Sequence, residues 1–132
     1  MDRLNSLSPY ALAALRIMSG MLFLAHGTQK LLSFPAGERA GAAWAFSSPG
    51  HYARAIELVV GLLIAVGLFT RPAAFLASGT MALAYFMAHA PQNFFPVNNG
   101  GDAAILYCFV FLYLFFAGPG TFSFDAAWRR PR

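Results

Sequence analysis

The fold of this chain is decided by residues 55–69, which read AIELVVGLLIAVGLF. Apart from Glu57, every residue in this stretch is apolar or glycine, so the stretch is typical of a helix that crosses a bilayer. A carboxylate near the centre of such a helix costs about 3 kcal/mol even on the insertion scales that give low values. We therefore expect Glu57 to face the interior of a helix bundle and to serve a function there.

Composition places the chain in a membrane. It has 132 residues, of which 58% are hydrophobic and only 11% are charged, and its mean hydropathy is +0.57. Soluble proteins carry about 25% charged residues, so this chain has too few charges to cover a water-facing surface. The net charge of +4 comes largely from Arg129, Arg130 and Arg132, a cluster suited to anionic membrane lipids. Nucleic acid is not expected as a partner, because no basic stripe with interleaved aromatic residues lies outside the apolar segments.

Four apolar segments have lengths that suit membrane-spanning helices. Each approaches the ~20 residues that span a bilayer, and prolines, glycines and polar residues separate them. We therefore predict a single all-α domain, residues 1–132, that forms a four-transmembrane-helix bundle of up-down topology. The expected spans are residues 9–32, 52–69, 72–89 and 102–117.

Local signals predict where these helices begin and end. Pro9 suits a first helical position after an N-cap at Ser8. The stretch 70–72, which ends in proline, is expected to break the second helix. Residues just before Asp102 are expected to extend the fourth helix, and a short interfacial helix is expected around residues 41–46.

Positively charged residues set the expected orientation. An even number of spans puts both termini on one side, and arginines gather at the termini and at Arg71, between the second and third spans. Because Lys and Arg favour cytoplasmic loops, we predict a multi-pass protein of the bacterial inner membrane with both termini in the cytoplasm. The connections 33–51 and 90–101 are then expected to face the periplasm.

Several of the few polar side chains are expected at one depth, near the outer surface of the bundle. The up-down topology brings one end of each helix to this level. We predict that His26, Glu57 and His89 line one interior cavity as catalytic residues, and we expect no metal ligands. The predicted cofactor-binding residues are Lys30, Tyr85, Asn93, Asn98 and Asp102, of which Asn98 and Asp102 are expected at the rim of the cavity.

Most of these residues also have explanations that need no function. Asp102 in a first helical turn interacts favourably with the helix dipole. Lys30 at a helix end can extend its ammonium group to lipid headgroups. Arg54 and Glu57 lie three residues apart, where they can neutralise each other within one helix. His26 is harder to explain in this way, because it lies inside an apolar segment.

A second charged pair is expected at the opposite end of the bundle. Arg16 lies inside the first apolar segment, and Asp125 follows the fourth. A buried arginine requires a partner. We predict an ion pair between Arg16 and Asp125 that has a structural role and closes the base of the bundle.

Taken in order along the chain, these polar landmarks resemble those of the DoxX family of small four-helix membrane proteins. The stretches that carry the resemblance are Leu15–Arg16–Ile17 with Gly20, residues 26–31 (HGTQKL), 57–63 (ELVVGLL), 67–71 (GLFTR), 84–91 (AYFMAHAP), 95–96 (FP), 99–102 (NGGD) and 106–109 (LYCF). Some members of this family are subunits of thiosulfate:quinone oxidoreductase, and others are linked to thiol and oxidant defence. The resemblance therefore implies a redox or quinone context, with this chain as the bare membrane unit.

One functional hypothesis is a quinone-reactive membrane subunit. Quinone carbonyls require hydrogen-bond donors, which His26 and His89 can supply, and Glu57 or Asp102 can accept protons. Aromatic residues are expected to line a slot for the ring: Tyr85, Phe86, Phe94 and Phe95. A haem held by two axial histidines is a less favoured variant.

The rival hypothesis is a non-enzymatic membrane component. Such a protein would be an anchor, an assembly partner or a small-solute carrier, either as a homodimer or with a partner oxidoreductase subunit. The sequence has one cysteine, Cys108, and lacks a dinucleotide fingerprint and a metal-cluster motif. Any electron transfer would therefore need a bound organic cofactor or a partner, and whether the chain is an enzyme stays open.

Overall fold

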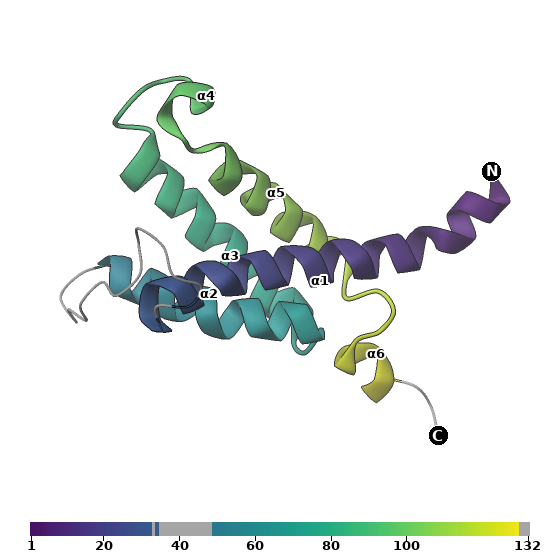
Figure 1. Ribbon diagram of the computed structural model, residues 1–132. Coiled ribbons are helices and arrows are strands. Elements are labelled where there is room, and N and C mark those ends of the chain that lie inside the picture. The colour runs from purple at the N-terminus through teal and green to yellow at the C-terminus, as the bar shows by residue number, and fades with distance from the viewer. Residues whose placement is uncertain (33, 35–48, 130–132) are drawn as a thin grey trace.

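A computed structural model describes residues 1–32, 34 and 49–129 of the protein. All of the regular elements in these ranges are helices, as predicted (Figure 1). They are α1 (Asp2–Leu32), α2 (Pro49–Val66), α3 (Thr70–Ala84), the π-helix η1 (Tyr85–His89), α4 (Pro96–Asn99), α5 (Asp102–Ala117) and α6 (Phe124–Trp128). The interfacial helix expected around residues 41–46 lies outside the described residues.

The four long helices form two pairs. α1 packs chiefly against α2, and α3 packs chiefly against α5, while α2 and α3 connect the pairs and α1 barely contacts α5. Figure 1 shows the α3–α5 pair diverging from the α1–α2 pair toward the end that carries α4. The arrangement therefore leaves a seam between α1 and α5.

Glycines bring α1 and α2 into close contact. A Cβ atom on Gly27 would lie 2.6 Å from the backbone nitrogen of Leu58, and one on Gly61 would lie 2.7 Å from that of Leu24. Side chains larger than hydrogen are therefore excluded at both crossing points, a pattern typical of tightly packed membrane helices. This contact fixes the α1 turn that carries His26 beside the α2 turn that carries Glu57.

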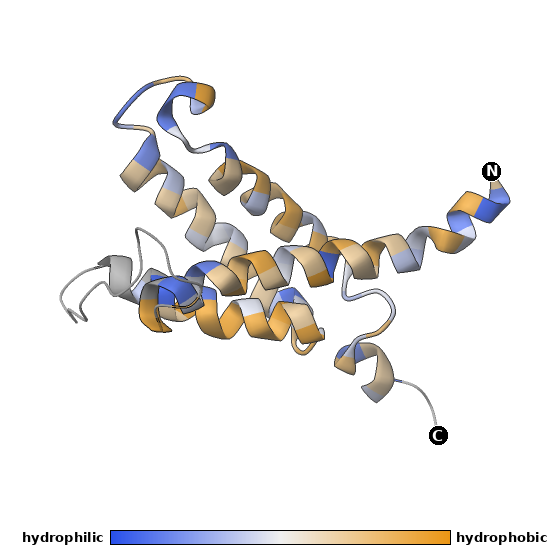
Figure 2. Cartoon of the chain, viewed as in Figure 1, coloured by the Kyte–Doolittle hydropathy of each residue, from blue (hydrophilic) through white to orange (hydrophobic). Residues whose placement is uncertain are grey.

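The interior is apolar, and so is most of the exterior. The most deeply buried apolar side chains include Phe23, Ile64, Phe111 and Leu114, whereas many other large apolar side chains are exposed. Figure 2 shows hydrophobic residues along most of α2 and α5, with hydrophilic ones near the N-terminus and around α4. Within the described residues, the segment Asp2–Gln29 is long and apolar enough to cross a membrane, and Asp102–Ala117 is a shorter apolar helix.

Several helix ends differ from the predicted spans. α1 begins at Asp2, so Pro9 lies inside the helix and is not its first residue. α2 ends at Val66, because Gly67 and Phe69 adopt left-handed backbone conformations with φ of 73° and 49°. The break thus precedes Pro72, which is tolerated in the first turn of α3 because the amide nitrogens there have no helical acceptor.

The fourth long helix has the predicted bounds but not the predicted extension. α5 begins at Asp102 and ends at Ala117. The residues before it form the separate short helix α4, which ends at Asn99 and is followed by Gly100 with φ of 70°. A left-handed residue reverses the backbone and cannot continue a helix, so α4 and α5 stay distinct.

The base of the molecule is closed by a network that we call the base junction: Arg16, Gly67, residues 119–123 and Asp125. The Arg16 side chain is fully buried and donates hydrogen bonds to the carbonyl groups of Pro119, Thr121 and Phe122, the last at 2.8 Å. The Asp125 carboxylate accepts from the backbone amides of Phe69 and Thr70, each at 2.9 Å. The predicted direct contact between Arg16 and Asp125 is not formed, because each side chain bonds to backbone groups that the turns leave unpaired. The charge of Asp125 still interacts favourably with Arg16, and the structural role of the pair stays a prediction.

Candidate functional site

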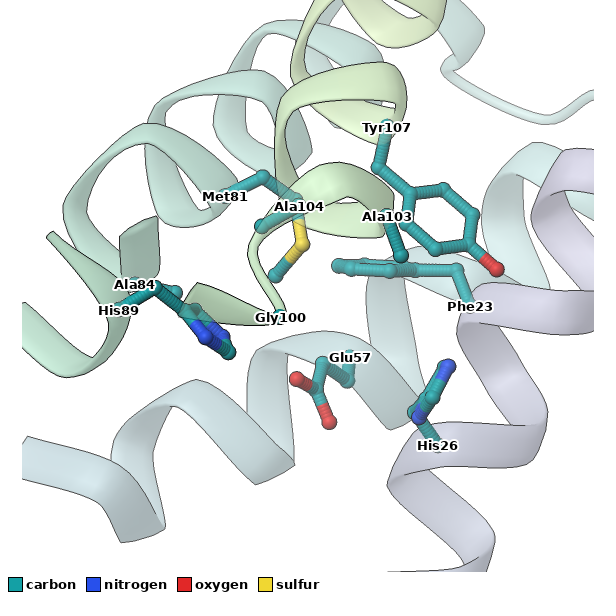
Figure 3. Close-up of a pocket in the computed structure, with 10 residues that line it drawn as sticks. All are labelled: Phe23, His26, Glu57, Met81, Ala84, His89, Gly100, Ala103, Ala104 and Tyr107. Carbon is teal, nitrogen blue, oxygen red and sulfur yellow. The ribbon is translucent and has the colours of Figure 1, made fainter. Parts of the chain in front are cut away.

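A cavity of about 300 Å³ lies between the two helix pairs (Figure 3). Every long helix contributes to its wall, and so does the turn before α5. The lining residues are Phe23 and His26 of α1, Glu57 of α2, Met81 and Ala84 of α3, His89 of η1, Gly100, and Ala103, Ala104 and Tyr107 of α5. Figure 3 shows the Glu57 carboxylate between the imidazoles of His26 and His89.

Glu57 is buried, with 4% of its surface exposed. Its position follows from the close α1–α2 contact, since a Cβ atom on Gly27 would lie 3.0 Å from the carbonyl carbon of Glu57. His26 immediately precedes that glycine and is half-buried. Helix packing at Gly27 therefore holds an acidic and a basic side chain at the same wall of the cavity.

Aromatic side chains form the wall next to His26. The Phe23 ring lies 5.0 Å from that of Phe111 and 6.0 Å from that of Tyr107, and the imidazole of His26 meets Tyr107 edge to face at 6.1 Å. Such rings offer a flat apolar surface against which another ring can pack.

The π-helix η1 positions His89. Its wider turn is closed by a hydrogen bond of 2.9 Å from the amide of Ala90 to the carbonyl of Tyr85, five residues earlier. π-Turns are rare and occur frequently at functional sites. His89 lines the cavity, whereas Tyr85, whose ring stacks on that of His89 with 6.4 Å between the ring centroids, lines an apolar groove between α3 and α5.

The hydrogen bond of His89 fixes its tautomer. Its Nδ1 atom lies 3.0 Å from the backbone carbonyl oxygen of Asn99. A carbonyl only accepts, so Nδ1 carries the hydrogen and donates it. Nε2 of the neutral ring is then the nitrogen that can accept a proton or a hydrogen bond.

Asn99 is one of the residues that sequence reasoning missed, although its neighbour Asn98 was chosen. Asn99 has 4% of its surface exposed. Its amide donates to the Tyr85 hydroxyl at 3.2 Å and to the Asn93 carbonyl at 2.9 Å, and its side-chain oxygen accepts from the amide of Gly101 at 2.8 Å. The Asn-Gly-Gly sequence was a signal for this turn, but only the fold shows which asparagine faces inward.

The other predicted site residues lie away from the cavity lining. Asn93, Asn98 and Asp102 are exposed, and the cavity is bordered instead by Gly100 and Ala103. The side chain of Lys30 lies outside the described part of the structure. Phe23 and Tyr107 were not predicted to line a site, because an aromatic residue in an apolar helix gives no sequence signal for its direction.

Proton exchange and hydrogen bonding are the chemistry that these side chains can perform. Within the described residues, no group of three His, Cys, Asp or Glu side chains is placed to hold a metal ion. A buried carboxylate beside two imidazoles can take up, hold and release a proton. The aromatic wall can hold a planar ring against these groups.

The fold and the cavity define a class: a small all-helical membrane protein with a buried carboxylate in a cavity between two helix pairs. The chain belongs to the DoxX family, whose model matches residues 11–90 and thus includes His26, Glu57 and His89. A relative from Haemophilus influenzae, named only as an uncharacterized protein, is 42% identical over 128 residues, covering 95% of this chain and 96% of the relative. No solved structure matches the chain.

Proposed function

We propose that this DoxX protein is a four-span inner-membrane protein whose cavity binds the ring of a quinone. The observation that supports this most directly is the convergence of His26, Glu57 and His89, from three helices, on one cavity with an aromatic wall. A quinone ring needs an apolar slot, groups that bind its two oxygens and groups that exchange protons with it. The cavity lining offers all three.

The cavity fits one ring. Ligand pockets commonly measure about 300–1,000 Å³, and this one, at about 300 Å³, is at the lower limit. Such a volume favours a single substituted ring over a haem macrocycle, even though His26 and His89 both line the cavity. When bound, a quinone supplies the capacity to carry two electrons and two protons.

The protein side chains have distinct roles in this proposal. Neutral His89 accepts a hydrogen bond from a ring hydroxyl at Nε2, and protonated His89 donates one to a ring carbonyl, while Nδ1 stays bonded to Asn99. Glu57 holds or releases the accompanying proton inside the cavity. Phe23 and Tyr107 pack against the ring. The electrons pass to or from a partner oxidoreductase subunit, because the chain offers no second cysteine or metal-cluster motif.

The direct test is native mass spectrometry of the protein extracted in its own lipids. We expect a bound quinone on the wild-type protein and its loss from Glu57→Gln, while Glu57→Gln remains folded. Leu62→Trp, on an exposed part of α2, is the control and should retain the quinone. A wild-type protein that carries a partner subunit but no quinone would instead support an anchor or assembly role. If the wild-type protein carries neither a quinone nor a partner subunit, the result would favour a role as a solute carrier.

The orientation in the membrane is part of the same proposal. Both termini are proposed to face the cytoplasm, on the basis of the arginine distribution. A Ser48→Cys variant that also carries Cys108→Ser should react with a membrane-impermeant thiol reagent added from the periplasm. Reaction only after the reagent reaches the cytoplasm would reverse the orientation.

A further inference from the structure

A second hollow adjoins the cavity along the seam between α1 and α5. It is a groove of about 330 Å³, and the side chains that form it are almost all apolar. Its lining residues are Leu15, Met18, Ser19 and Leu22 of α1 with Ala103, Leu106, Tyr107 and Val110 of α5. We call it the α1–α5 groove.

The groove and the cavity share two lining residues, Ala103 and Tyr107. Figure 3 shows both on the α5 wall of the cavity, near Phe23. Ala103 is exposed and Tyr107 is half-buried, so a small side chain and a partly exposed ring lie between the two hollows. The two hollows are therefore neighbours on α5, without a fully buried side chain among the residues that they share.

We propose that the α1–α5 groove binds the hydrocarbon tail of the ligand whose ring lies in the cavity. This inference rests on the proposed function and makes the ligand more specific: a quinone that carries a long apolar chain and is dissolved in the membrane. The ring lies among His26, Glu57 and His89, and the chain leaves past Tyr107 toward the base of the molecule.

The length and chemistry of the groove suit a hydrocarbon chain. On α1 it runs from Leu22 back to Leu15, seven residues or ~10 Å of helix at ~1.5 Å per residue. Two of its side chains carry a hydroxyl, Ser19 and Tyr107, and Ser19 donates its own to the carbonyl groups of Leu15 at 2.6 Å and of Arg16 at 3.2 Å. The surface of the groove is almost entirely apolar, so a hydrocarbon chain lying in it displaces little water from polar groups.

A second groove adjoins the cavity on the other side of α5 and is the less suitable path. It lies between α3 and α5, measures about 270 Å³, and shares Met81 and Ala104 with the cavity. Both of these residues are buried, with 7% and 8% of their surfaces exposed, so they close the connection. The helices on either side of this groove also pack closely, whereas α1 and α5 barely touch.

The test compares two probes on the protein in lipid nanodiscs. One is 2,3-dimethoxy-5-methyl-1,4-benzoquinone, and the other has the same ring with a decyl chain at position 6; empty nanodiscs correct for partitioning into lipid. Leu22→Trp fills the groove without touching the cavity. Leu62→Trp is its matched control, since the two leucines have 51% and 52% of their surfaces exposed.

We expect Leu22→Trp to weaken binding of the decyl probe about tenfold, the loss produced when roughly two methylene groups lose their contacts. Binding of the ring-only probe should not change, and Leu62→Trp should match wild type with both probes. Glu57→Gln should weaken both probes. If Leu22→Trp behaves like Leu62→Trp while Glu57→Gln still weakens both, the tail groove is refuted and the ring site stands. If Glu57→Gln affects neither probe, the proposed function itself fails.

Photo-crosslinking on the unmodified protein provides a second measurement that does not depend on how the variants fold. A decyl probe with a diazirine at the end of its chain should label Leu15, Met18 or Val110. Labelling of Phe86 or Phe109, which line the groove between α3 and α5, would overturn the assignment.

Discussion

The base junction and the cavity both bury ionisable side chains in an apolar chain, yet they use them differently. At the base, Arg16 and Asp125 direct their charged groups to backbone carbonyls and amides. At the other end, Glu57, His26 and His89 line a hollow of about 300 Å³. A buried charge that bonds to the backbone stabilises a turn, whereas a titratable group that lines a cavity can meet a ligand. Burial of a charge alone therefore does not identify a functional residue.

The largest effect on stability is expected from Arg16→Ala. It leaves the carbonyl groups of Pro119, Thr121 and Phe122 without their donor, and each hydrogen bond to a charged group contributes roughly 1.5–3 kcal/mol. We expect a loss of about 3 kcal/mol or more in thermal unfolding of the purified protein. Arg71→Ala is the control, because Arg71 also donates to two carbonyl groups, those of Phe115 and Phe116, but is exposed. Equal losses for both variants would mean that the burial of Arg16 adds nothing to the free energy of unfolding.

Glu57→Gln should weaken ligand binding without lowering stability, in contrast to Arg16→Ala. It removes the charge of a buried side chain but keeps its shape and its capacity for hydrogen bonds, so unfolding should occur close to the wild-type temperature. Ring binding should weaken about tenfold or more, as when a charge-assisted hydrogen bond is lost. Paired titrations and melting curves would measure both effects. A sharp loss of stability with ligand binding retained would place Glu57 in the same structural class as Arg16.

Asn99→Ala should disturb the cavity without removing any group that lines it. The change deletes three hydrogen bonds of the turn that presents the Asn99 carbonyl to His89. We expect the ¹⁵N spectrum of His89 to show the Nδ1–H tautomer in the wild type and a mixture of tautomers in the variant. Asn98→Ala is the control, since Asn98 is exposed. An unchanged His89 spectrum in Asn99→Ala would show that the turn holds its shape without this side chain.

The smallest effect is the pH dependence of the base junction. Burial alone would raise the pKa of Asp125, but hydrogen bonds from Thr70 and Phe69 and the charge of Arg129 outweigh it, so the pKa lies below its ordinary value of 3.8. The ionised carboxylate therefore adds stability above that value, and this contribution is lost as the pH falls through the lowered pKa. Asp125→Asn should flatten the acid limb of a melting-temperature profile, whereas Asp2→Asn, at the exposed N-terminus, should not. If the melting temperatures of wild type and Asp125→Asn fell equally with decreasing pH, the lowered pKa of Asp125 would not account for the acid sensitivity.

Sequence reasoning predicted the family, the all-helical class and the membrane location, and the comparisons and the structure confirm these three. The number of spans, the orientation and the roles of the site residues stay predictions. Sequence reasoning selected His26, Glu57 and His89 because polar residues are rare in this chain. The structure brings these three side chains to one cavity. Sequence reasoning also selected Asn98 and Asp102, which are exposed. Depth along a helix can be counted from sequence, but the direction of a side chain in a turn cannot.

The sequence by itself determined that these segments are helices and that Glu57 requires a protected place, because hydrophobic runs and the cost of a buried charge are local properties. Only the tertiary structure decided that Arg16 bonds to backbone carbonyls and that α1 and α5 leave a seam beside the cavity. It also decided that, at the π-turn Tyr85–His89, His89 lines the cavity while Tyr85 lines the groove between α3 and α5. These features depend on how closely helices that are distant in sequence approach each other, which is fixed by the packing of whole helix pairs.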